Sequence, residues 1–79
     1  MKVIRETEIQ FRAKRSYDKS NDICMGYITE SATNFYVSIK VMGYECLSVE
    51  NWKVSKKRVK SDREALRVIA NEAYERGNI

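Results

Sequence analysis

The chain of 79 residues is 43% hydrophobic and 33% charged, with a formal net charge of +4. This length excludes a second domain, so we expect residues 1–79 to form a single domain with a small core, and the composition is globular rather than disordered. No apolar run reaches the roughly 18 residues that cross a bilayer, and MKVIRETEIQ lacks the apolar stretch of a secretory signal. We therefore expect a cytoplasmic protein that does not contact membranes.

The first predicted element is a half-buried strand over residues 3–14, where apolar and polar side chains alternate. One face would carry Val3, Thr7, Ile9, Phe11 and Ala13, and the other Glu6, Glu8, Gln10, Arg12 and Lys14. Residues 15–22 are rich in Ser, Asp and Asn, whose side chains bond to nearby backbone groups, so a loop is predicted there.

Two further strands are predicted over residues 23–30 and 35–44, joined by a short hairpin connection at residues 31–34. In the second of them, one face would carry Phe35, Val37, Ile39 and Val41, and the other Tyr36, Ser38, Lys40, Met42 and Tyr44. Gly43 indicates a bulge or the end of that strand. Residues 45–54 form either one more short strand or a small hairpin around Glu50 and Asn51.

The C-terminal helix is predicted to begin at about Asp62, because Ser61 and Glu64 have the spacing of a capping box, in which each side chain bonds the other's free backbone N–H group. The apolar face would carry Ala65, Leu66, Ile69, Ala70, Ala73 and Tyr74, and the other side Arg63, Arg67, Asn71, Glu72, Glu75 and Arg76. Glu72 and Arg76 have the spacing of an ion pair, and Gly77 lies where a helix needs a left-handed residue to end.

Strands followed by one helix predict an α+β fold, with an antiparallel sheet of three to four strands and the C-terminal helix packed on one face. The other face would be open and would carry Arg12, Lys14, Tyr36, Lys40, Met42 and Tyr44. Cations interleaved with aromatic rings on an open sheet can hold single-stranded nucleic acid. The alternative is an ordinary solvated face whose tyrosines cover neighbouring strands.

A basic run precedes the helix and comprises Lys53, Lys56, Lys57, Arg58 and Lys60, with Arg63 just inside the helix. Beside a helix N-terminus, which attracts anions, such a run can grip a phosphate backbone or an acidic protein patch. Alternatively, it is a solvated linker with Val54 and Val59 tucked beneath it. We interpret Trp52 as a core or rim residue rather than a stacking platform, because a small domain needs it for burial.

Positive charge is concentrated at the two ends of the chain. Residues 1–20 carry six basic and three acidic side chains, residues 21–50 carry one and four, and residues 51–79 carry eight and four. A dedicated nucleic-acid binder usually gathers its positive charge on one surface. The acidic centre therefore favours an acidic or nucleoprotein partner over a general grip on nucleic acid.

No motif points to catalysis, a cofactor or a metal. Without histidine, the chain lacks the commonest general base at neutral pH and every Ser-His or Cys-His nucleophile. Its three glycines form no phosphate-binding loop, and no carboxylates are paired by their spacing. Cys24 and Cys46 have no CxxC spacing, so no zinc site is expected. We interpret them as two buried thiols of a reducing compartment rather than as a disulfide.

The segments EIQFRAKR (residues 8–15) and MGYI (residues 25–28) resemble the first two strands of phage proteins of the YopX type. This resemblance implies a phage or prophage origin, and no functional residue is carried over from it. In size and layout, the chain is also similar to anti-CRISPR proteins and other phage inhibitors. That similarity implies an action by occupying the surface of a partner in a host cell.

The sequence thus predicts a small non-catalytic, phage-encoded binding protein that inhibits or modulates a host nucleoprotein complex, such as a defence complex, by steric occlusion. One alternative is a protein that binds DNA or RNA directly through the same residues, and another is an enzyme whose site the sequence does not reveal. The candidate partner-binding residues are Arg12, Lys14, Tyr36, Lys40, Tyr44, Lys53, Lys56, Lys57, Arg58, Lys60 and Arg63.

Overall fold

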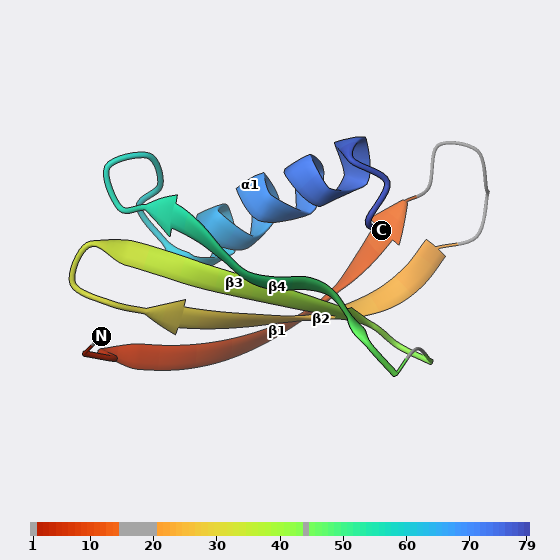
Figure 1. Cartoon of the computed structure of the whole chain (residues 1–79), viewed down its shortest axis with the longest axis horizontal. Coiled ribbons are helices and arrows are strands. Elements are labelled where there is room, and N and C mark those ends of the chain that lie inside the picture. Colours follow the sequence, from red (N-terminus) through yellow and green to blue (C-terminus); the bar gives the residue numbers. More distant parts are fainter. Residues whose placement is uncertain (1, 15–20, 44) are drawn as a thin grey trace.

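The computed structural model describes residues 2–14, 21–43 and 45–79, without the side chains of residues 13, 14, 21 and 22. Four strands and one helix follow each other along the chain: β1 (Arg5–Lys14), β2 (Asn21–Glu30), β3 (Asn34–Val41), β4 (Leu47–Ser55) and α1 (Asp62–Glu75). The strands form one antiparallel sheet in the order β1-β2-β3-β4, and α1 packs against one of its faces (Figure 1). The predicted α+β fold is confirmed.

The cross-strand register places the apolar sides of the strands together. Ile39 pairs with Gly26 on β2 and with Val49 on β4, and Gly26 pairs with Ile9 on β1. Paired residues project to the same face of a sheet, so this row lies on the side of α1. The predicted inward face of β3 is confirmed, because its four apolar residues are each at most 3% exposed.

The core lies between α1 and the strands β2, β3 and β4. The helix contributes Ala65, Leu66, Ile69 and Ala73, and Val59 is buried from the segment before the helix. Gly26 lets α1 approach the sheet closely, because a Cβ atom at this position would lie 2.6 Å from Leu66 Cδ1.

The first strand is covered less completely than the others. Ile9 and Phe11 project to the same side as the core, but both are only half-buried. Every other strand contributes at least two fully buried apolar side chains. The helix is therefore placed over β2, β3 and β4 and leaves the β1 edge of the sheet partly open.

Some strand boundaries differ from the predicted ones. β3 ends at Val41 rather than at residue 44, and Gly43 lies in a turn with φ of 94°. β1 begins at Arg5, which leaves Val3 exposed. β2 begins at Asn21, because this residue pairs with Lys14 and this pairing overrides the turn preference of asparagine. The rest of the predicted loop, residues 15–20, lies outside the described residues.

β4 is one strand with two irregularities in its pairing with β3, which resolves the alternative of a strand or a hairpin. Val37 pairs with Trp52 and Ile39 with Val49, so two steps on β3 correspond to three on β4. This is the count of a β-bulge. Asn51 has a positive φ of 50°, which asparagine tolerates better than most residues. Its backbone N–H donates to Ser38 Oγ at 3.0 Å, so the bulge satisfies this buried hydroxyl.

The predicted ends of α1 are confirmed, with one difference in the capping box. Ser61 Oγ accepts a hydrogen bond from the Glu64 N–H at 3.2 Å, but the Glu64 carboxylate accepts from the N–H of Lys60, one residue before the cap. At the other end, Gly77 has φ of 77°, and its N–H donates to the Tyr74 carbonyl. Asn78 donates to the Ala73 carbonyl, which completes a Schellman motif.

The two cysteines differ in exposure. Cys24 is fully buried, as predicted, whereas Cys46 is exposed and free. The prediction of two buried thiols is therefore wrong for Cys46, because it lies in the β3–β4 connection and not in a strand.

Candidate functional site

The sheet face that points away from α1 is here called the open face. Three predicted residues share it by the strand alternation, namely Arg12 on β1 and Tyr36 and Lys40 on β3. Lys53, predicted as part of the basic run, also lies on it, directly opposite Tyr36 on β4. Two other predicted residues, Tyr44 and the side chain of Lys14, lie outside the described part of the chain.

The open face carries large apolar side chains that sequence reasoning missed. Ile23 and Tyr27 of β2 are each 37% exposed, and Leu47 of β4 is 41% exposed. Met25 is half-buried between them and pairs with Lys40. The signal was present in the sequence, because residues 23, 25 and 27 alternate with the buried residues 24, 26 and 28 and give β2 two apolar faces.

Charges of both signs border these apolar side chains. Glu6 and Glu8 lie exposed on β1, at one edge of the open face, and Lys53 lies exposed on β4, at the opposite edge. Lys40 is half-buried in the interior, between Met25 and Leu47. The open face is therefore amphipathic, with apolar side chains on β2 and at the start of β4, with Glu6, Glu8 and Arg12 on the β1 edge and with Lys53 on the β4 edge.

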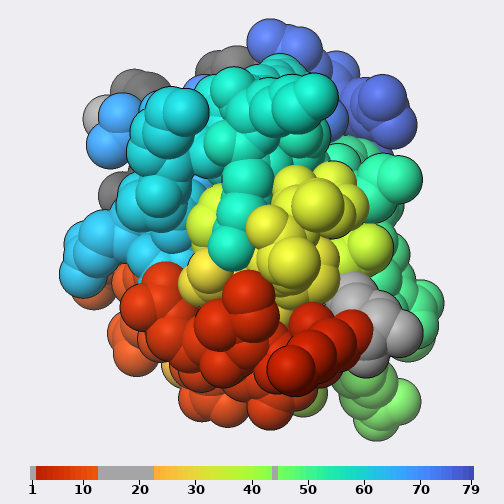
Figure 2. Space-filling view, turned by 90° about the vertical axis from the view of Figure 1, so that its left-hand side faces the viewer, coloured from red at the N-terminus to blue at the C-terminus, as the bar shows by residue number. Residues whose placement is uncertain are grey.

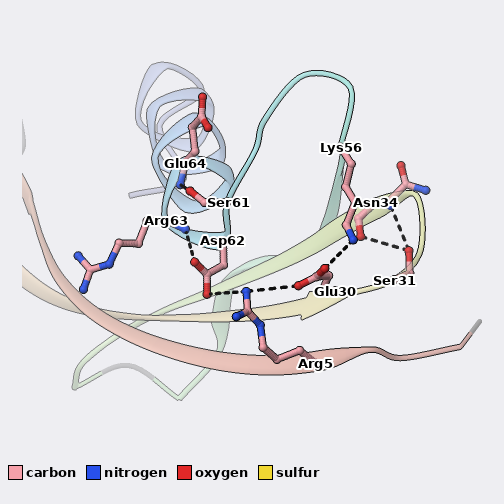
Figure 3. A network of polar contacts seen from close by, with 9 residues as sticks. All are labelled: Arg5, Glu30, Ser31, Asn34, Lys56, Ser61, Asp62, Arg63 and Glu64. Carbon is pink, nitrogen blue, oxygen red and sulfur yellow. Dashed lines mark hydrogen bonds and ion pairs between the residues drawn. The ribbon is translucent and has the colours of Figure 1, made fainter.

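Lys56 of the predicted basic run is held within the fold. Its Nζ lies 2.5 Å from Glu30 Oε2, and it also lies 5.4 Å from the centre of the Phe35 ring. Glu30 accepts a second cation, the Arg5 guanidinium, which also contacts Asp62 at 3.3 Å (Figure 3). Lys56 thus links β2 to the segment after β4, and the interpretation of a solvated run is wrong for this residue.

The ion pairs of Glu30 and Asp62 lie at one end of the molecule, where they join separate segments of the chain. Figure 2 shows the N-terminal residues, the β2–β3 hairpin and the segment between β4 and α1 side by side on this end. The hairpin is itself tied by Ser31, whose side chain exchanges hydrogen bonds of 3.1 Å with the backbone of Asn34 (Figure 3). The ion pairs and hydrogen bonds of this group of residues therefore have a structural role, because they join separate segments of the fold.

The remaining basic residues of the run differ in their partners and in their exposure. Arg58 pairs with Glu72 of α1 at 3.0 Å. The predicted ion pair of Glu72 with Arg76 is not formed among the described side chains, because the Arg76 guanidinium lies over the Trp52 ring instead. Lys57 and Lys60 are exposed, and no ion pair involves either of them among the described side chains. Val54 and Val59 are buried beneath the run, as predicted.

A groove between β1 and α1 brings two of the predicted residues together. Arg12 of β1 and Arg63 of α1 both line it, and Arg67, which was not among the predicted site residues, lies beside them. The groove has a volume of about 360 Å³, and its lining includes the half-buried Ile9 and Phe11. The sequence did not reveal this cluster, because Arg12 is separated from Arg63 by more than fifty residues.

Trp52 is half-buried on the helix side of β4, opposite Val37, which confirms its interpretation as a rim residue. The Arg76 guanidinium lies 5.1 Å from the centre of its ring, a cation–π contact between β4 and the end of α1. The ring is covered by the protein's own cation and is not presented as a platform for a base.

Among the described side chains, no three of Cys, Asp and Glu come together in a way that could hold a metal ion. In the same part of the chain, α1 is too short and too polar to cross a membrane. Comparisons of the chain with protein families, with curated proteins and with solved structures found no match. The resemblance to the YopX type therefore stays a prediction.

Proposed function

We propose that the chain is a small non-catalytic binding protein that docks through its open face on a protein of a host nucleoprotein complex and blocks that complex sterically. The observation that carries this proposal is the amphipathic character of the open face. Ile23 and Tyr27 of β2 and Leu47 of β4 are exposed on this face, although a polar side chain at any of these positions would take nothing from the core. The choice of a host complex follows the predicted phage origin.

The distribution of charge favours a protein partner over nucleic acid. A phosphate backbone would meet Glu6 and Glu8 on β1, and the resulting repulsion would oppose binding across the full width of the face. A protein partner can match charges of both signs at the same time, which adds specificity to the apolar contact.

Direct binding of nucleic acid remains the second candidate, and one observation favours it. Arg12, Lys40 and Lys53 share the open face with Tyr27 and Tyr36. A single strand that follows β2 and β3 could stack its bases on the tyrosines and place its phosphates on the cations.

The proposal is tested with two double variants at exposed positions. Ile23→Asp with Leu47→Asp changes side chains that are 37% and 41% exposed at the open face, whereas Val3→Asp with Ile4→Asp changes side chains that are 45% and 58% exposed outside it. Both proteins should stay folded. In pull-downs from nuclease-treated host lysate, only the open-face variant should lose the captured complex, and only the wild type and the control should inhibit the activity of that complex.

Equal capture and inhibition by both variants would refute the role of the open face. The second candidate is separated from the first by salt. Binding to random-sequence single strands that falls steeply with the logarithm of salt concentration, and is lost in Lys40→Glu with Lys53→Glu, would favour direct contact with nucleic acid.

A further inference from the structure

The groove between β1 and α1 has an apolar floor that the fold leaves uncovered. Ile9 and Phe11 of β1 line it from one side, and Leu66 and Ala70 of α1 line it from the other. Ile9 and Phe11 point to the same side as the fully buried Ile28 and Ile39, yet they are only half-buried. The groove can therefore bury further apolar surface if an apolar side chain enters it.

One wall of the groove is the free edge of the sheet, since β1 pairs only with β2 among the described strands. The N–H of Met42 donates to the carbonyl of Ile23 at 2.8 Å, so the peptide groups of Ile23 point to β3. In an antiparallel sheet, successive residues direct their peptide groups to opposite sides. Ile23 pairs with Arg12 on β1. Because the peptide groups of Ile23 point to β3, those of Arg12 point away from β2 to the free edge, and those of Gln10, two residues earlier, do the same. Both residues line the groove.

The charged side chains that the structure describes in the lining of the groove are all positive. Its described lining includes the arginines Arg12, Arg63 and Arg67 and no acidic residue. In the part of the chain that the structure describes, none of these three guanidinium groups is paired with a carboxylate, in contrast to Arg5 and Arg58. Clustered, unpaired arginines favour an occupant with carboxylates or another planar anion.

We propose that this groove binds an extended acidic peptide segment of a partner protein, which adds to the sheet as a fifth strand beside β1. The backbone of the segment would bond to the outward peptide groups of Gln10 and Arg12. An apolar side chain would enter the floor between Ile9 and Leu66, and carboxylates two residues away in the segment, which project to the same face, would pair with Arg63 and Arg67 of α1. This site is separate from the apolar side chains of the open face, so it does not depend on the function proposed above.

An extended peptide matches the apolar floor, the free sheet edge and the positive charge of the groove, whereas other occupants match fewer of these features. A single nucleic-acid strand satisfies the arginines, but it brings no row of backbone donors and acceptors for a free sheet edge. An amphipathic helix fits the apolar floor, but its backbone groups are already bonded within the helix.

The test uses the full chain and a fluorescein-labelled peptide of about eight residues, the length of an ordinary strand, in which valine and glutamate alternate along one face and threonine occupies the other face. Fluorescence anisotropy should show saturable binding. Arg63→Glu with Arg67→Glu should weaken it by about tenfold or more, because two charge-assisted contacts are lost. Lys2→Glu with Lys57→Glu is the matched control, since it makes the same change in net charge at exposed residues outside the groove and should change the affinity by less than about twofold.

Two further measurements identify the mode of binding. With bound peptide, the amide protons of Gln10 and Arg12 should exchange more slowly with solvent. A peptide that is N-methylated at alternate residues should bind more weakly when the methyl groups occupy the edge that pairs with β1.

The proposal is overturned if no binding is detected at millimolar peptide, if both charge variants weaken binding equally, or if N-methylation on either edge has no effect. Tighter binding of an oligothymidine of the same length, lost in the Arg63 and Arg67 variant, would identify a nucleic-acid site in place of a peptide site.

Discussion

At the scale of single residues, neighbours in the basic run have different surroundings. Lys56 pairs with Glu30, and its side chain is only 27% exposed, whereas the adjacent Lys57 is exposed to solvent. The Lys56 ammonium and the Glu30 carboxylate are both partly withdrawn from water, so their attraction is screened less than that of a surface pair. The lysines of the run therefore do not share one environment.

Lys56→Glu should reduce the free energy of unfolding by about 1–2 kcal/mol, because it removes one cation from Glu30 and places a like charge beside it. Lys57→Glu, one residue away, should change it by less than about 0.5 kcal/mol. Urea denaturation followed by circular dichroism measures both. Equal effects of the two substitutions would show that Lys56 is as solvated as Lys57.

At the scale of elements, α1 is defined by local signals at both of its ends. Ser61 caps its first turn, and Gly77 takes the left-handed conformation that ends it. These contacts join residues at most five apart in the chain, so their pattern is visible in the sequence. The same holds for the alternation in β3, whose inward face was predicted residue by residue.

Ser61→Ala should lower the free energy of unfolding by about 1 kcal/mol, because the N–H of Glu64 loses its acceptor at the helix N-terminus. Ser61→Asp retains a side-chain acceptor and should stay within about 0.5 kcal/mol of the wild type. Thermal or urea unfolding checks this pair. If alanine were as stable as serine, water would satisfy the N–H of Glu64 equally well.

At the scale of the whole molecule, the placement of α1 decides which apolar side chains are core and which are surface. Residues on both faces of β2 are apolar, but Cys24, Gly26 and Ile28 are buried, while Ile23 and Tyr27 lie on the open face. The helix is placed over β2, β3 and β4, and this placement creates both the open face and the groove along β1.

Ile39→Asp should abolish cooperative unfolding, since it buries a carboxylate at a position with 0% exposure and the cost is comparable to the total stability of a small domain. Met42→Asp, at 54% exposure three residues later, should leave a cooperative transition. Calorimetry distinguishes the two outcomes. A cooperatively melting Ile39→Asp protein would contradict the assignment of the inward face of β3.

The sequence by itself determined the elements of this protein, because periodicity, caps and turn residues act over a few neighbouring positions. It predicted the α+β class, the inward face of β3 and both ends of α1. Only the tertiary structure decided which distant residues meet: Glu30 with Lys56, Arg58 with Glu72, and Arg12 with Arg63 and Arg67. Such pairings depend on strand register and on the position of the helix across the sheet, which are set by packing of the whole core and not by any local pattern.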